Sequence, residues 1–251
     1  MSRAKLMLAR APVAYRWASH ALNLLRLVLR TPHEPDFAAF ALFAGRRGIF
    51  LDVGANVGQS ATSFRAVDRT TQILSIEANP LLEPDLRFVK RFVRRFDFRI
   101  CAASDVAARL TLHVPLYRGL PLTGEASLDR AMTHDLYWLR QQHVADARDE
   151  VSLRAVQVQS MRLDDLHVVP AFVKLDVQGF ELQALKGLAA TLAAHRPVIL
   201  VERTAIAGVT EFLGAIGYRP FAYLANERRF EAYDGGDTLN LFFLHADEDI
   251  A

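Results

Sequence analysis

The sequence has almost no cysteine: among its 251 residues only Cys101 is present. A single thiol excludes a disulfide within the chain and a zinc site built from cysteines. The eight histidines lack the short paired spacing of metal-binding helices, so we expect no bound metal. The absence of disulfides is typical of a reducing compartment, and we expect a cytoplasmic protein.

A strong excess of charge is also missing. The chain has 30 basic and 28 acidic residues, a formal net charge of +2. This balance gives no sign of a nucleic-acid-binding surface across the whole chain, and we expect no nucleic-acid partner. The hydrophobic fraction of 51% is ample for one large core, and the length fits one α/β domain with additions.

Acidic residues are absent from the first 33 positions, which carry six bases. Between Pro12 and Pro32 apolar residues recur at helical spacing, so we expect residues 1–45 to form a basic helical extension. Asn23 and Arg26 interrupt the apolar run, which argues against a membrane-spanning helix. We favour a helix packed on the domain with its arginines in solvent. The alternative is weak peripheral contact with an anionic membrane, or an organelle address.

Strands and helices alternate over most of the remaining chain, residues 46–251. This alternation indicates an α/β fold with a mostly parallel sheet covered by helices on both faces. The last two predicted strands, Tyr218 to Leu224 and Asn240 to Leu244, are joined by a polar stretch and are expected to form a hairpin at the sheet edge. Four predicted strands end in an acid: Asp52, Glu77, Asp176 and Glu202.

Residues 105–160 break this alternation. Leu110, Leu112 and Val114 alternate with polar neighbours, which predicts a half-buried antiparallel strand. The rest of this insertion is irregular and polar. Loops above an α/β sheet commonly shape the substrate site, so we expect the insertion to influence substrate choice.

The stretch FLDVGANVGQS, residues 50–60, predicts a ligand-binding loop. Gly54 and Gly58 let the backbone approach a ligand, and the following helix offers free N–H groups. The G-x-G-x-x-G pattern of a dinucleotide site is absent. Glu77 ends the next strand, where an acid can accept both hydroxyls of a ribose. Together these features indicate a nucleoside cofactor, and S-adenosylmethionine is the obvious candidate.

Each part of this cofactor has an expected position. Its methionine part is expected along the glycine loop, its ribose on Glu77 and its adenine near the end of the third strand. Carboxylates also suit a cationic sulfonium better than a polyphosphate. The expected cofactor-binding residues are Asp52, Gly54, Asn56, Gly58, Glu77, Ala78, Asn79 and Asp105.

Four segments resemble the FkbM family of methyltransferases: DVGANVG at 52–58, SIEANP at 75–80, VKLDVQGFE at 173–181 and PVILVER at 197–203. The resemblance runs from about Asp36 to Leu244, and its third segment is the most specific. It implies a class I, Rossmann-like fold with a seven-stranded sheet and an antiparallel C-terminal edge strand. It also implies S-adenosylmethionine-dependent methyl transfer to a hydroxyl of a small molecule or glycan. A companion element at 160–166 has Met161 where the family more often has threonine.

The third segment supplies most of the candidate catalytic residues. Asp176 ends the strand nearest the expected transfer site and is the first candidate for a base or an acceptor-orienting group. Lys174 shares its face of the strand and could pair with it. Gln178 can hydrogen-bond the acceptor. Glu202 could orient the acceptor or, with Asp176, hold a divalent cation, and we favour the role without a metal. Glu181, in the first turn of a helix, could equally serve only to stabilise the helix dipole.

Other activities stay open on the sequence alone. His113 and His143 are alternative bases, although structural histidines are commoner. A nucleic-acid or N-methyltransferase of the same fold is the nearest rival, but LDVQGFE stands where an amino-methylating nucleic-acid enzyme has [DNS]PP[YFW]. A non-catalytic module that binds S-adenosylmethionine and a nicotinamide oxidoreductase are more distant alternatives.

Overall fold

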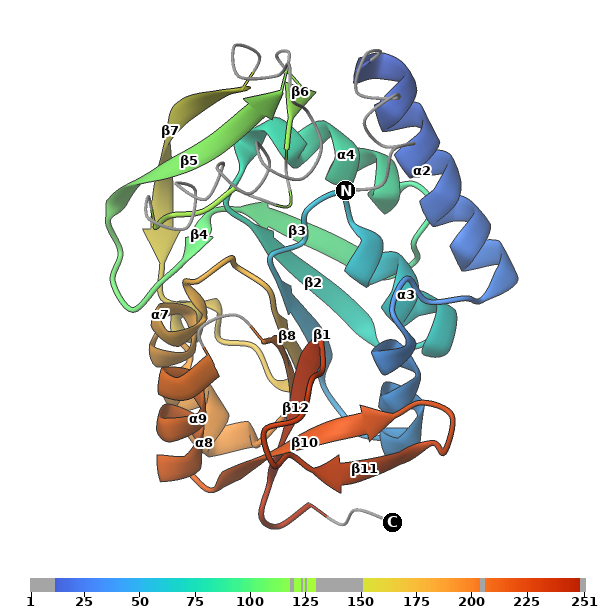
Figure 1. Cartoon of the computed structure of the whole chain (residues 1–251), viewed down its shortest axis with the longest axis vertical. Coiled ribbons are helices and arrows are strands. Elements are labelled where there is room, and N and C mark those ends of the chain that lie inside the picture. Colours follow the sequence, from blue (N-terminus) through green and yellow to red (C-terminus); the bar gives the residue numbers. More distant parts are fainter. Residues whose placement is uncertain are drawn as a thin grey trace.

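The structure is a computed structural model. It describes residues 12–117, 120–122, 124, 126–129, 151–203 and 206–248. Figure 1 shows a large twisted sheet with helices on both faces and a smaller sheet near one end of it. In the described ranges, no helix combines the length and apolarity needed to span a membrane.

The large sheet has eight strands in the order β11-β10-β12-β9-β8-β1-β2-β3. The five strands β9, β8, β1, β2 and β3 are parallel, and the other three are antiparallel. The chain runs outward from β1 in one direction and returns to β8 on its other side. This reversal of strand order creates the crevice in which ligands of α/β sheets bind. The strands are β1 Ile49–Val53, β2 Gln72–Glu77, β3 Phe96–Ile100, β8 Pro170–Leu175, β9 Val198–Glu202, β10 Tyr218–Leu224, β11 Arg229–Ala232 and β12 Asn240–His245.

The expectation of seven strands is therefore wrong, and so is the position of the last strand. β12 lies between β9 and β10, while β11 forms the edge. β11 was not predicted because its sequence, RFEA, has only one residue, Phe230, that packs against the core. β12 reads NLFFLH, and its first five residues are all buried. A continuous apolar run of this kind is typical of an internal strand.

The smaller sheet has the order β4-β7-β5-β6. Its strands are β4 Ala102–Ala103, β5 Arg109–Tyr117, β6 Leu120–Pro121 and β7 Val151–Met161. β5 contains the predicted antiparallel strand and pairs with β7 along its whole length. Figure 1 shows that this sheet rises above one end of the large sheet, so part of the insertion stands over the crevice.

Helices cover the two faces of the large sheet separately (Figure 1). One side carries α2, α3, α4 and the 3-10 helices η1 and η2, and the other carries α7, α8, α9 and η5. The predicted helix from Glu181 to Ala194 is divided at Gly187, where a Cβ would lie 1.9 Å from the backbone oxygen of Ser104. The helices are α2 Pro12–Leu29, η1 Pro35–Phe43, α3 Gln59–Val67, η2 Pro80–Leu82, α4 Glu83–Lys90, η5 Leu163–Leu166, α7 Glu181–Lys186, α8 Ala189–His195 and α9 Ile206–Ala215.

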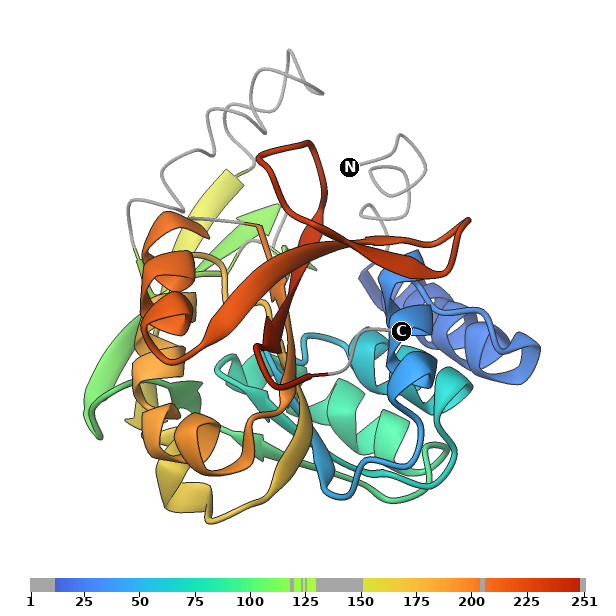
Figure 2. The same cartoon turned by 90° about the horizontal axis from the view of Figure 1, so that it is seen from below.

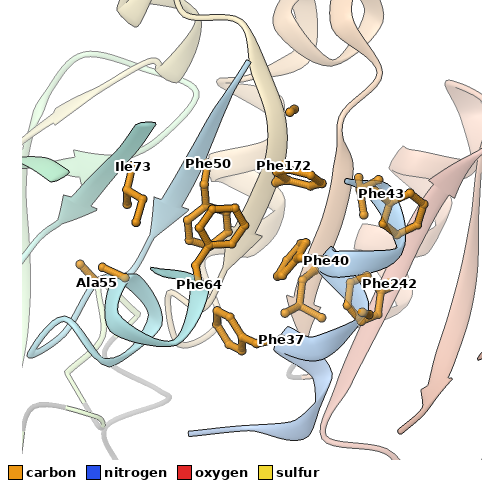
Figure 3. Close-up of a cluster of buried hydrophobic side chains, with 14 of the residues drawn as sticks. Phe37, Phe40, Phe43, Phe50, Ala55, Phe64, Ile73, Phe172 and Phe242 are labelled. Carbon is orange, nitrogen blue, oxygen red and sulfur yellow. The ribbon is translucent and has the colours of Figure 1, made fainter. Parts of the chain in front are cut away.

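Phenylalanine dominates the core on the η1 side of the sheet (Figure 3). Phe37 and Phe40 come from η1, and Phe40 contacts Phe50, Phe172 and other rings at centroid distances near 5.5 Å. Burying each such ring contributes about 1.5–3 kcal/mol. A domain boundary at residue 45 stays a prediction, but residues 35–43 share one core with the sheet.

Candidate active site

A cavity of about 390 Å³ lies at the carboxyl ends of β1, β2, β8 and β9. One wall is formed by the glycine loop after β1 and the end of β2, and the opposite wall by the loop after β8 and the end of β9. Apolar side chains of the smaller sheet and its insertion, such as Leu112 and Leu128, complete the lining. The polar residues that line it are Glu34, Asn56, Gln59, Glu77, Asp176, Gln178 and Glu202.

The two loops that form these walls touch each other at Gly54. Its φ of +90° is a left-handed conformation that favours glycine, and a Cβ there would lie 1.8 Å from the backbone oxygen of Asp176. The loop after β1 therefore packs directly on the loop after β8. No larger residue fits at this position without moving one of the loops.

Glu77 fixes the glycine loop from the neighbouring strand. Its two carboxylate oxygens accept hydrogen bonds from the backbone N–H groups of Asn56, at 2.7 Å, and Asn79, at 2.8 Å. Burial raises the pKa of Glu77 to about 7, assisted by repulsion from Asp52 and Asp176 and opposed by these two hydrogen bonds. Each oxygen still has a lone pair that can accept a ligand hydroxyl.

Two amide oxygens at this end of the cavity have unused acceptor capacity. Within the described part of the chain, Asn56 Oδ1 and Gln59 Oε1 are buried and have no hydrogen-bond partner. Both residues line the cavity. A buried acceptor without a partner costs free energy, so a ligand that donates hydrogen bonds or carries positive charge would be stabilised here.

The opposite wall holds a chain of charged and amide groups. Lys174 Nζ donates to Asp176 Oδ2 at 2.9 Å, and Gln178 Nε2 donates to Asp176 Oδ1 at 2.9 Å and to Glu202 Oε2 at 2.8 Å. Lys174 is buried, and its Cα is paired with that of Asp52 on β1. The amide of Gln178 thus holds the two acids side by side over a buried cation.

The two acids differ in how they titrate. Burial alone would raise the pKa of Asp176, but the Lys174 ammonium and hydrogen bonds from its neighbours lower it well below its usual range. Burial and repulsion from Asp176 raise the pKa of Glu202 to about 8. The Gln178 amide bridges the two carboxyl groups. At neutral pH the pair therefore holds one proton, mainly on Glu202.

Glu181 supports the loop that carries Gln178. Its Oε1 accepts hydrogen bonds from the backbone N–H groups of Val177, at 3.1 Å, and Gly179, at 3.2 Å. Ser127 Oγ, from the insertion, donates to the backbone oxygen of Gln178 at 2.7 Å. These bonds stabilise the positive φ of 52° at Gln178. Glu181 therefore braces the loop between β8 and α7 through its side chain.

Four residues expected to contact the cofactor lie outside the cavity lining. Asp52 is fully buried beneath it, and its Oδ2 accepts a hydrogen bond from Ser75. Gly58 begins α3 and packs against Val89, so a Cβ would collide there. Asn79 caps η2 through its side chain, and the exposed Asp105 follows β4.

The other expected contacts are brought together. Gly54, Asn56, Glu77 and Ala78 line the same cavity as the three predicted catalytic residues. Of the two alternative bases, His113 lies on β5 and pairs with Ser127, and His143 lies outside the described residues. In the described ranges, no three His, Cys, Asp or Glu side chains are arranged to hold a metal ion.

Sequence reasoning missed Glu34, which lines the cavity from the segment between α2 and η1. Its Oε2 accepts a hydrogen bond from Asn240 Nδ2 at 3.1 Å, and its Oε1 lies 3.1 Å from His33 Nε2. Burial raises its pKa, but hydrogen bonding and attraction from His33, together with Lys174, lower it overall. The only signal was its position as the first acid in the chain.

Known proteins resemble the chain in sequence and in structure. A family model described as "Methyltransferase FkbM domain" matches residues 52–220. A structure of methyltransferase FkbM from Methylobacillus flagellatus KT has 17% identity and a TM-score of 0.51, and the match covers 96% of this chain and 58% of that one. This chain therefore spans under three fifths of that protein's length.

A putative O-methyltransferase from Klebsiella pneumoniae has 14% identity and a TM-score of 0.40, with 90% of each chain covered. That TM-score is too low to establish a shared fold. No match was found among curated proteins.

Proposed function

The chain belongs to the FkbM methyltransferase family, and we propose that it transfers the methyl group of S-adenosylmethionine to a hydroxyl of a small molecule or glycan. The observation that carries this proposal is the single cavity in which the glycine loop and Glu77 face the Asp176–Glu202 pair. One wall offers what a nucleoside cofactor needs, and the other offers what a hydroxyl acceptor needs.

The residues at the glycine-loop end fit S-adenosylmethionine. Glu77 would accept the ribose hydroxyls, and the partnerless oxygens of Asn56 and Gln59 would accept from the ammonium group. Gly54 keeps the backbone open to the methionine part. When bound, the cofactor supplies a methyl group activated by a cationic sulfur, and the acidic lining stabilises that charge.

The opposite wall would orient the acceptor and take its proton. Asp176, kept ionised by Lys174, would accept a hydrogen bond from the acceptor hydroxyl and aim its oxygen across the cavity. Such positioning contributes up to about 7–11 kcal/mol to the lowering of a barrier. The O–H proton would pass to the ionised Glu202 carboxylate as the acceptor oxygen takes the methyl group. The S–CH3 bond would break and leave a neutral thioether, so the charge lost at sulfur equals the negative charge neutralised at Glu202.

This assignment predicts how the rate depends on pH. Glu202, with a pKa of about 8, can accept a proton only after losing its own. Methyl transfer should therefore accelerate by up to about tenfold per pH unit below 8 and level off above it.

Calorimetric titration of S-adenosylmethionine tests the cofactor assignment. We expect binding to the wild type and at least about tenfold weaker binding to Glu77→Ala. Asp105→Ala is the matched control: this exposed acid lies outside the cavity, and binding should be unchanged. Tighter binding of NAD than of S-adenosylmethionine would contradict the assignment. Production of S-adenosylhomocysteine across a panel of sugars and polyketide-like alcohols would then identify the acceptor class.

A further inference from the structure

The helix α2 exposes an apolar face and packs against the domain through a mixed face of polar residues and Leu27. At 100° per residue, a sector of about 140° contains only apolar residues, and all seven are exposed. The exposed fractions of its five large side chains run from 46% to 76%. We name this sector the α2 apolar face; it consists of Trp17, Ala18, Ala21, Leu22, Leu25, Val28 and Leu29.

Polar contacts fix the orientation of α2. Asp85, buried on α4, accepts two hydrogen bonds from Arg16, at 2.6 and 2.9 Å, and lies 2.7 Å from His20 Nε2. The His20 ring stacks on Phe88 at 4.1 Å. Asn23 Nδ2 donates to the backbone oxygen of Val57 in the glycine loop. Turning the apolar face inward would break this set, so its exposure is a stable property of the fold.

The surroundings of the α2 apolar face are basic. Arg26 and Arg30 border it, and the helix contains no acid. The exposed apolar surface continues onto the neighbouring element, because Trp17 contacts Phe88 and Phe88 contacts Phe92, which is 48% exposed. Around Phe92 stand four exposed bases, two of them paired with acids: Arg87, Lys90, Arg91 and Arg94.

We propose that the α2 apolar face docks on an anionic lipid surface. A helix with Trp and Leu on one face, flanked by arginine and without acids, matches the pattern of helices that lie in the membrane interface. Residues 17–29 span about 18 Å, and both views place α2 at the periphery of the molecule (Figures 1 and 2). Anionic headgroups would neutralise the flanking arginines while the apolar side chains enter the acyl boundary.

Docking would hold the active site close to the membrane. The contact between Asn23 and Val57 joins α2 to the loop that borders the cavity. An enzyme held in this way would meet amphiphilic or membrane-bound acceptors at raised local concentration. The lipid contact itself does not depend on the proposed methyl transfer.

Co-sedimentation of the full chain with lipid vesicles tests the proposal. We expect binding to vesicles of phosphatidylcholine with phosphatidylglycerol, and little binding to phosphatidylcholine alone. The triple variant Trp17→Gln/Leu25→Gln/Leu29→Gln should reduce the partition coefficient by at least about tenfold. Glutamine retains helix propensity close to that of leucine, so α2 should persist. Arg26→Gln/Arg30→Gln should weaken binding to anionic vesicles by about 30-fold and reduce its salt dependence.

A matched control separates this face from exposed apolar surface in general. Leu239 is 59% exposed and Leu29 is 60% exposed, so Leu239→Gln should leave vesicle binding unchanged. In a Trp138→Phe background Trp17 is the sole tryptophan, and its emission should shift to the blue only with anionic vesicles.

Two results would overturn the proposal. One is wild-type binding that is absent at every lipid composition, or that survives the triple variant. The other is a dimer, seen by light scattering, that the triple variant dissociates while vesicles fail to bind. That outcome would assign the α2 apolar face to a second copy of the chain.

Discussion

The two ends of the cavity hold their acids in different ways. At the glycine-loop end, Glu77 is surrounded by backbone N–H groups of its own loop and its neighbour. At the other end, Asp176 and Glu202 are held by side chains, with Lys174 as the buried cation. The first arrangement suits binding hydroxyl groups that take no part in the reaction, such as those of a ribose. The second pairs an ionised acid, Asp176, with a protonated one, Glu202, whose raised pKa suits it to exchange a proton with a hydroxyl.

The largest expected effect on stability comes from a substitution at Gly54, where the loop after β1 contacts the loop after β8. Gly54→Ala places a Cβ on the backbone oxygen of Asp176, and we expect unfolding free energy to fall by more than about 5 kcal/mol or soluble protein to be lost. Gly45→Ala is the control, because Gly45 has a similar φ of +95° but nothing within 4 Å of its Cβ position. Urea denaturation measures both. Equal losses would show that backbone strain, and not the contact of the loops, is what matters at Gly54.

Removing the Lys174 cation should destabilise the two acids beside it, Asp176 and Asp52. Lys174→Met leaves buried carboxylates without their partner and should lower the unfolding free energy by about 3–5 kcal/mol at pH 7. The loss should shrink in acid, where Asp176 and Asp52 are protonated. Lys186→Met, at an exposed lysine of α7, should have almost no effect. If the Lys174 variant were equally unstable at all pH values, packing rather than charge would explain the position.

Among these substitutions, one at Glu202 should change the unfolding free energy least. The raised pKa of Glu202 decides at which pH the change is seen. Between pH 4.5 and about 8 the folded chain keeps a proton on Glu202 that the unfolded chain has lost, so rising pH lowers the unfolding free energy. Glu202→Gln cannot ionise and should be a few degrees more stable than the wild type at pH 9, and similar at pH 5.

The same variant should slow methyl transfer by about 10²–10⁴-fold, since it removes the proton acceptor. Glu211→Gln, on the exposed side of α9, serves as the control for both measurements. Thermal melts at several pH values, together with initial rates on an identified acceptor, would check these expectations. A variant that keeps full activity would exclude Glu202 as the base.

The two ends also differ in how far the sequence predicted them. Gly54, Asn56 and Glu77 follow β1 and β2 directly, and the rule that ligands bind at the carboxyl ends of parallel strands located them. The same rule located Asp176 and Glu202. It could not reveal Glu34, whose position depends on Asn240, 206 residues away in the chain.

Tertiary contacts explain why the sequence-based prediction of the fold was wrong in two places. The period of apolar residues predicted the helix Pro12–Leu29 but suggested that its apolar side would pack inward. The bonds from Arg16 and His20 to Asp85 reverse that orientation. β11 escaped notice because an exposed edge strand has little apolar pattern of its own.

The bonds from Asn240 to Glu34 and Asp36 also set an order of events during synthesis. The segment that supplies Glu34 is made 206 residues before Asn240 of β12, a strand that must insert between β9 and β10. A nascent chain can form β1, β2 and the glycine loop while the opposite wall is still incomplete. The position of Glu34 in the cavity wall is therefore fixed only after β12 has been made and has paired with β9.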